Sequence, residues 1–230
     1  MHLFYCPALA DGVMELPEEE AHHAVHVLRV RAGDRVGLLD GRGARAEAEV
    51  LDASKRGCSV QVAHLARSAK DPAEGLHIAV APTKQMERFE WFLEKATEIG
   101  IGRITPVLTT RTERAKLRHD RMERVLVSAI KQSQRVWLPQ LDALTSLSEL
   151  ATASTPQRFF GWCEGTHEAF TQAYRPGPAA LMLIGPEGDF TPEEADLLRG
   201  KGFTAVSLGE ARLRTETAAL AACTWMSLRK

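Results

Sequence analysis

The chain has 230 residues, of which 44% are hydrophobic and 26% are charged, and its formal net charge is −1. These values are ordinary for a soluble globular protein, and no apolar run reaches the roughly 18 residues of a membrane-spanning helix. The first residues lack the basic region and apolar core of a secretion signal. Four scattered cysteines without a CxxC pair argue against a disulfide framework or a structural zinc site. We therefore expect a cytoplasmic protein with one large domain or two small ones.

The first third of the chain predicts mostly β-structure. One helix is expected from about Glu18 to Leu28, with Pro17 at its start. Turn signals occur at residues 40–43 and 55–57, and short strands separated by turns are typical of a small barrel. The polar segment at residues 66–75, which contains Pro and Gly, is predicted to be the linker between this part and the rest of the chain. The expected strands are residues 3–6, 35–39, 44–51 and 59–65.

From residue 76 onward the pattern changes to alternating strands and helices. The first helix of this part carries apolar residues at helical spacing up to Ile99, and Gly100 is expected to end it. Such alternation indicates a mostly parallel sheet covered by helices, which is an α/β fold. The expected strands are residues 76–81, 104–108, 159–162, 180–184 and 203–208.

Two glycine-bearing loops in the last fifth of the chain predict a ligand site. The first, residues 185–190, follows a buried strand and leads into Thr191-Pro192, an N-cap followed by proline at the first helical position. The second, residues 208–214, precedes a helix that begins at Thr215 or Thr217. Loops at the carboxyl ends of parallel strands share one edge of the sheet, so these two predict a crevice there. The P-loop, dinucleotide-binding and nucleophile-elbow signatures are absent.

Residues 111–135 hold eight Lys or Arg against three acidic residues, a local excess of five positive charges. A basic segment of this kind is either a phosphate-binding surface or a solvated helix face with internal ion pairs. Glu113 with Arg114 and Asp120 with Arg124 are the ion pairs that the second interpretation predicts. His22 and His26 share a helix face, but no third ligand is near them in the sequence, so we expect no metal site.

Taken together, the two loops resemble one known family. The stretches 184–190 and 208–218 are similar to the C-terminal motifs of bacterial 16S ribosomal RNA uridine N3-methyltransferases. These enzymes belong to the SPOUT superfamily of trefoil-knot, S-adenosylmethionine-dependent methylases. The resemblance extends through residues 95–106 and 132–135 and, near the N-terminus, residues 23–41. It implies a PUA-like RNA-binding barrel at residues 1–70, a trefoil-knotted parallel-sheet methyltransferase domain at residues 76–230, and a homodimer.

The resemblance also implies that S-adenosyl-L-methionine is the cofactor and that it binds between the two loops. An adenine ring needs a flat apolar slot, and glycines let the backbone approach it closely. The N–H groups that open the last helix suit a polar or anionic group. The implied cofactor-binding residues are Ile184, Gly185, Pro186, Glu187, Gly188, Leu208, Gly209, Leu213, Thr215, Thr217 and Ala218.

Methylation of uridine N3 requires the loss of the proton that N3 carries. A nearby cation stabilises the negative charge that develops on the base, and Arg214 is the first candidate for that role. Glu216 and Glu98 are candidates for removing the proton or for orienting Arg214. The alternative role of both acids is a helix-terminal position or an ion pair.

The basic residues acquire a function from the same resemblance. Phosphate contacts would position the RNA, while the target base leaves its stack to reach the methyl group. Arg29 and Arg31 are expected contacts on the barrel. The other implied RNA-binding residues are Lys84, Arg111, Arg114, Gln132 and Arg135.

Two positions depart from the family pattern. The family commonly has a second glycine where this chain has Asp189, and aspartate tolerates left-handed backbone better than most residues. The family commonly has an arginine where this chain has Ala211, with Arg212 one place later. The role of that arginine is therefore either taken over by Arg212 or lost.

The resemblance thus implies methylation of N3 of a specific uridine of 16S ribosomal RNA in the small ribosomal subunit. Fold alone does not fix the substrate. The alternatives are a related knotted methylase acting on tRNA or on another rRNA nucleotide, and an RNA-binding assembly factor without catalysis. An α/β domain with an unrelated ligand is the remaining alternative.

Overall fold

The computed structural model describes residues 1–54 and 56–228, and it divides into two compact units. Unit 1 comprises residues 1–71 and 127–138, and unit 2 comprises residues 72–126 and 139–230. The chain therefore returns to the N-terminal unit after the linker that the sequence predicts at residues 66–75. Lys55, in one of the predicted turns, lies outside the described residues.

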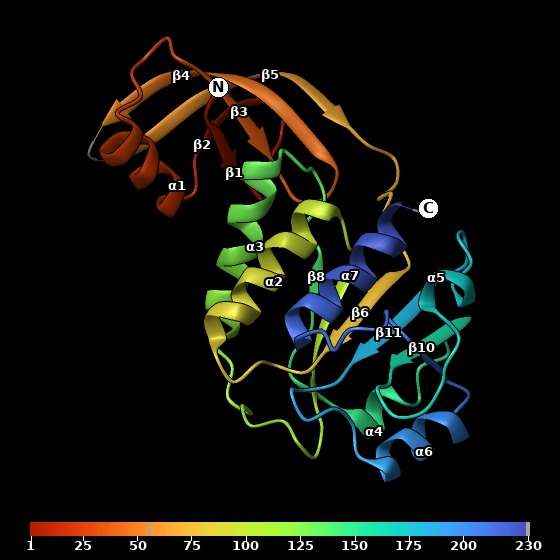
Figure 1. Ribbon diagram of the computed structural model, residues 1–230. Helices are drawn as coiled ribbons and strands as arrows, with labels where there is room; N and C mark the ends of the chain where they lie inside the picture. Colours follow the sequence, from red (N-terminus) through yellow and green to blue (C-terminus); the bar gives the residue numbers. More distant parts are fainter. Residues whose placement is uncertain (55, 229–230) are drawn as a thin grey trace. The chain divides into compact units, whose positions relative to one another are not determined.

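Unit 1 contains a five-stranded mixed sheet with the order β1-β3-β4-β5-β2 (Figure 1). Strand β1 runs parallel to β3 and the other pairs are antiparallel. In β4, buried and more exposed residues alternate from Ala44 to Val50, as expected for a sheet with one face on a core. Phe4, Leu38 and Val60 are part of that core. The strands are β1 (Leu3–Tyr5), β2 (Gly12–Glu15), β3 (Arg35–Leu39), β4 (Ala44–Ser54) and β5 (Gly57–Arg67).

The predicted helix at residues 18–28 is present but changes its winding half-way. It begins as α1 (Glu18–His22) and continues as a π-helical segment, η1 (His23–Leu28), which ends at Arg29 in a left-handed conformation. Strand β2 was not predicted, because its four residues include Gly12 and carry no strong alternation.

Residues 127–138 complete unit 1. They comprise the second half of α3 (His119–Ser133) and the residues that follow it. The ammonium group of Lys131 lies 2.7 Å from the carboxylate of Glu20. The Gly43 amide donates to the Val136 carbonyl at 2.8 Å, and the Leu138 amide donates to the Gly41 carbonyl at 2.9 Å. These contacts join a segment from the middle of the sequence to the β3–β4 turn.

Unit 2 has the predicted α/β fold. Its seven-stranded sheet has the order β12-β10-β11-β6-β7-β8, with β9 beside β7, and its pairings are parallel (Figure 1). The central strand β11 is buried along its whole length. The strands are β6 (Leu76–Val80), β7 (Arg103–Leu108), β8 (Gln140–Leu141), β9 (Thr145–Ser146), β10 (Gln157–Gly161), β11 (Ala180–Ile184) and β12 (Thr204–Val206).

Helices cover both faces of this sheet. On one face, α7 contacts β6, β11 and α2, and the other face packs against the apolar residues of α4 and α6. Helix α2 ends at Gly100 as predicted, with a φ of 103°. Helix α6 begins with the predicted Thr191 cap, which forms a reciprocal capping box with Glu194. The helices are α2 (Met86–Ile99), α4 (Leu147–Leu150), α5 (Phe170–Ala173), α6 (Pro192–Gly200) and α7 (Thr215–Leu228).

Among residues 1–54 and 56–228, no helix is both long and apolar enough to cross a membrane. In the same part of the chain, no three His, Cys, Asp or Glu side chains are grouped so that they could hold a metal ion.

Candidate active site

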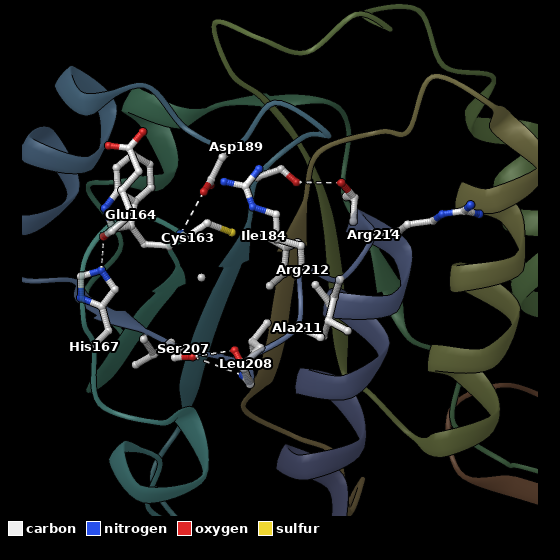
Figure 2. A pocket seen from close by; sticks show the side chains of 18 of the residues that line it. Cys163, Glu164, His167, Ile184, Asp189, Ser207, Leu208, Ala211, Arg212 and Arg214 are labelled. Carbon is white, nitrogen blue, oxygen red and sulfur yellow. Dashed lines mark hydrogen bonds between the residues drawn. The ribbon is translucent and has the colours of Figure 1, made fainter.

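A cavity of about 800 Å³ opens at the carboxyl ends of β10, β11 and β12 (Figure 2). This volume lies within the range of about 300–1,000 Å³ that is usual for small-molecule sites. Three segments line it, which we name the first loop (residues 184–190), the second loop (residues 206–214) and the third loop (residues 161–167). Both loops that the sequence singled out are therefore walls of one cavity.

The first loop is held by a tight turn. The Asp189 amide donates to the Pro186 carbonyl at 2.9 Å, and Asp189 has a φ of 62°, in the left-handed region that the sequence predicted it to tolerate. A side chain at Gly185 would meet the Asp189 carboxylate and the Phe190 amide at 3.2 Å. Close packing inside the turn therefore favours glycine at this position.

The first loop is also bound to every neighbouring strand end. The Glu187 carboxylate accepts from the Lys84 amide, 3.0 Å away in the loop after β6. The Arg111 guanidinium, after β7, donates to the carbonyls of Gly188 and Phe190. On the other side, the Cys163 amide in the third loop donates to the Asp189 carboxylate at 3.0 Å, which Figure 2 marks with a dashed line.

The second loop makes mostly local contacts. The Ser207 hydroxyl donates to the Gly209 carbonyl at 3.1 Å and accepts from the Gly209 amide at 3.2 Å. Residues 209–214 are exposed, and Gly209 has a φ of 129°, which only glycine adopts readily. The loop ends at Thr215, the first residue of α7, whose hydroxyl donates to the Gly185 carbonyl at 3.2 Å. The beginning of α7 is thereby fixed to the first loop.

The third loop was missed by sequence reasoning. Residues 163–166 are exposed, and the His167 ring nitrogen lies 2.7 Å from the Glu164 carbonyl. Burial, together with the charge and hydrogen bonding of Asp189, raises the pKa of the Cys163 thiol, while the charge of Arg212 lowers it. The signal was present in the sequence, because β10 is another apolar strand followed by a glycine-bearing loop, with Gly165 at a φ of 87°.

Most of the predicted cofactor-binding residues line the cavity. The exception is Thr217, which is exposed on α7 and is not among the lining residues. Arg212, which follows the departure at Ala211, lines the cavity as well. The predicted residues that line it are Ile184, Gly185, Pro186, Glu187, Gly188, Leu208, Gly209, Leu213, Thr215 and Ala218.

Of the three predicted catalytic residues, the structure brings Arg214 to the cavity. Arg214 is one of the lining residues, and in Figure 2 its side chain extends away from Cys163 and Asp189. Glu216 is 7% exposed on the first turn of α7, and its carboxylate lies 3.8 Å from the Arg88 guanidinium on α2. Glu98, also on α2, pairs with Lys95 at 2.9 Å. Neither acid lines the cavity in this chain; both occupy the ion-pair role that the sequence left open.

The predicted RNA-binding residues fall into two groups. Lys84, Arg111 and Arg114 belong to unit 2, next to the first loop, where Arg114 donates to the Lys84 carbonyl at 3.0 Å. Lys84 itself pairs with Glu113 at 3.0 Å. The second group belongs to unit 1 and consists of Arg29, Arg31, Gln132 and Arg135.

The basic segment at residues 111–135 is extensively paired. The predicted pair of Asp120 with Arg124 is present at 3.1 Å, and Arg118 joins it at 2.8 Å. Glu113 contacts Lys84 and not the predicted Arg114. The exposed positive charge of the segment is therefore smaller than the residue count suggests.

The comparisons with known proteins agree with this geometry. Residues 70–227 match the family model of an RNA methyltransferase domain, and residues 16–63 match that of an RNA methyltransferase PUA domain. The chain belongs to the RNA methyltransferase family. The matched domain holds the whole cavity.

Relatives of this RNA methyltransferase match over nearly its full length. The Ribosomal RNA small subunit methyltransferase E of Mycobacterium bovis is 30% identical, over 96% of this chain and 88% of that protein. A crystal structure of a probable rRNA-methyltransferase from Porphyromonas gingivalis is 38% identical, with a TM-score of 0.91 over 99% of this chain and 98% of the other. The Ribosomal RNA small subunit methyltransferase E of Neisseria gonorrhoeae, bound to S-adenosyl methionine, is 28% identical, with a TM-score of 0.90 over 99% and 97% of the two chains.

Proposed function

We propose that this protein transfers a methyl group from S-adenosylmethionine to N3 of one uridine in the 16S ribosomal RNA of the small ribosomal subunit. The protein is an S-adenosylmethionine-dependent rRNA methyltransferase. The observation that carries the proposal is that the first and second loops, which α6 separates in the sequence, form the walls of one cavity in an RNA methyltransferase domain. Relatives named for small-subunit ribosomal RNA, one of them bound to the cofactor, support the choice of substrate and methyl donor.

The residues of the cavity fit this cofactor. Ile184, Leu208 and Leu213 supply apolar surface for an adenine ring, and Gly185 and Gly209 let the backbone approach its edge. The cavity combines such apolar surface with a few polar groups, as small-molecule sites usually do. When bound, S-adenosylmethionine supplies an electrophilic methyl group on a positively charged sulfur atom.

The residues of the chain contribute to catalysis chiefly by positioning. Uridine N3 must lie in line with the methyl group, and holding the two in that geometry removes much of the barrier. Arg214, which is one of the residues that line the cavity, then turns its guanidinium to the base and stabilises the negative charge that develops as the N3 proton leaves. Glu216 and Glu98 remain our candidates for accepting the proton or for orienting Arg214, and each must first exchange its present ion pair.

We extend the proposal to the finer architecture. Unit 2 is a trefoil knot, an exception to the general absence of knots. The resemblance of the first and second loops to the SPOUT methylases is the support for this topology. Unit 1 acts as a PUA-like RNA-binding barrel and unit 2 as the catalytic domain, and two chains form a homodimer in the cytoplasm. The match of residues 16–63 to the PUA-domain model supports the first of these roles.

The experiment uses labelled S-adenosylmethionine and small-subunit particles from cells that lack the native N3-methyluridine, followed by nucleoside mass analysis. Naked 16S rRNA and tRNA are the parallel substrates. N3-methyluridine at a single 16S position is the expected product. A methylated nucleoside in tRNA, or at another rRNA position, would overturn the substrate. Cofactor binding without transfer to any of the three RNAs would favour a non-catalytic assembly factor.

A further inference from the structure

Asp189 combines a costly backbone conformation with a place in the wall of the cavity. Among the described residues, four that are not glycine have a positive φ, namely Arg29, His64, Gln134 and Asp189. Asp189 is the member of this group that lines the cavity. Left-handed backbone is cheapest for glycine, so a turn alone would be served better by glycine than by aspartate. The aspartate side chain must therefore contribute something that compensates for its backbone.

The carboxylate of Asp189 makes two hydrogen bonds that glycine could not make. One oxygen accepts from the Phe190 amide at 2.8 Å, within the first loop. The other accepts from the Cys163 amide at 3.0 Å, in the third loop. The second bond spans 26 positions of sequence and joins the strand ends of β10 and β11. A charged acceptor makes such bonds stronger than a neutral one does.

Near Cys163, the third loop makes few other hydrogen bonds to the rest of the protein. Residues 163–166 are exposed, and the bond of His167 to Glu164 lies within the loop. Its two ends are fixed, because the Trp162 amide donates to Val206 and the Ser207 amide donates to Glu168. Between these ends, the bond from Cys163 to Asp189 ties the third loop to the first.

The first loop, in contrast, is rigidly placed. Arg111 donates to the carbonyls of Gly188 and Phe190, on both sides of Asp189, and Glu187 accepts from the Lys84 amide. Asp189 therefore joins the first loop, which is fixed, to the third loop, which is more exposed. A loop that is held in place before binding costs less entropy when a ligand binds.

We propose that Asp189 is a positioning residue that holds the third loop against the first and thereby sets the affinity of the cavity for S-adenosylmethionine. This inference rests on the proposed function, because it takes the cavity to be the cofactor site. It gives the departure from the family's second glycine a role: the side chain adds a cross-loop bond that glycine lacks.

The test compares two substitutions at this position. Asp189→Gly relieves the backbone and removes both side-chain bonds, so the variant is expected to fold. Asp189→Asn keeps the shape and one good acceptor. The dissociation constant for S-adenosylmethionine, measured by calorimetry without RNA, should rise about tenfold in the glycine variant and about threefold in the asparagine variant. Asp196→Asn, on the exposed face of α6, is the matched control and should leave it unchanged.

A second measurement follows the cross-loop bond itself. Hydrogen exchange of the Cys163 amide should be fastest in Asp189→Gly, intermediate in Asp189→Asn and at the wild-type rate in Asp196→Asn. An effect on general stability would instead change exchange throughout unit 2. In steady-state assays, the glycine variant should raise the KM for the cofactor more than it lowers kcat.

The outcomes separate this inference from the proposed function. If Asp189→Gly binds the cofactor as tightly as the wild type, the proposal for Asp189 is wrong, whereas the proposed function is unaffected. If the wild type binds the cofactor and the variants weaken it in the expected order, Asp189 has this role whichever RNA is methylated. If the wild type does not bind S-adenosylmethionine, both proposals are wrong.

Discussion

The first and second loops of the cavity look alike in sequence but are built differently. Each follows a strand, contains glycine and leads into a helix. The first loop is tied by Glu187, Asp189 and Arg111 to the loops after three other strands. The second loop bonds mainly to itself and leaves residues 209–214 exposed. We expect from this difference that the first loop gives the cavity its shape and that the second loop, which carries Arg214, contacts the substrate.

The largest expected effect comes from the second loop. Arg214→Ala removes the cation that we propose stabilises charge on the base, and loss of one such donor lowers kcat by about 100-fold or more. The dissociation constant for S-adenosylmethionine should change little. Single-turnover methylation of small-subunit particles, with calorimetry alongside, checks both statements. Arg214→Lys should recover part of the rate, and a near-native rate in Arg214→Ala would reject the catalytic role.

The shape of the first loop is broken most directly at Gly185. Its substitution by alanine places a methyl group 3.2 Å from the Asp189 carboxylate and the Phe190 amide. We therefore expect the free energy of unfolding to fall by about 1–3 kcal/mol. Cofactor binding should weaken as well. Gly200→Ala, at the end of α6 where there is open space, is the control and should change stability by less than about 1 kcal/mol. Equal stability of the two variants in chemical denaturation would contradict this account.

Arg111 distinguishes the structure of the first loop from contact with RNA. Its guanidinium holds two carbonyls of that loop, so Arg111→Ala should raise the dissociation constant for S-adenosylmethionine several-fold even without RNA. Arg114→Ala, which leaves those carbonyls untouched, is the comparison and should leave cofactor affinity near the wild-type value. If Arg111→Ala changes only the affinity for RNA and its salt dependence, its role is phosphate contact alone.

The smallest effect concerns the third loop. Because the pKa of the Cys163 thiol is raised, its thiolate fraction at a given pH is lower than that of a free cysteine. Its alkylation by iodoacetamide should therefore still accelerate with pH above the pKa of about 8.5 of an ordinary thiol. The other three cysteines are buried, so labelling reports on Cys163. Saturating S-adenosylmethionine should slow the labelling, and unchanged rates would place the cofactor elsewhere.

Sequence reasoning succeeded where the signal is local. The Thr191 cap with Pro192, and the end of α2 at Gly100, depend on neighbours in the chain and could be predicted from them. The parallel sheet followed from the alternation of strands and helices. The crevice between the first and second loops could be predicted because both follow parallel strands, whereas nothing in either loop specifies that β10 lies between β11 and β12.

The elements that were missed depend on contacts between distant residues. The third loop becomes part of the cavity only because β10 pairs with both β11 and β12. The candidate acids illustrate the same limit. Glu216 lies two residues after Arg214, yet the first turn of α7 directs it towards Arg88 on α2. Sequence spacing identified the residue types, whereas the direction of each side chain is set by packing.

The return of residues 127–138 to unit 1 has a consequence for synthesis on the ribosome. Helix α1 and the five-stranded sheet are translated by residue 67, but the contacts of Glu20, Gly41 and Gly43 to residues 131–138 cannot form until some 70 further residues have been made. The N-terminal unit must therefore wait, incomplete, while the first strands and helices of unit 2 leave the exit tunnel. A fragment that stops at residue 71 lacks part of its own structure, so the boundary that looks natural in the sequence is the wrong place to divide this protein.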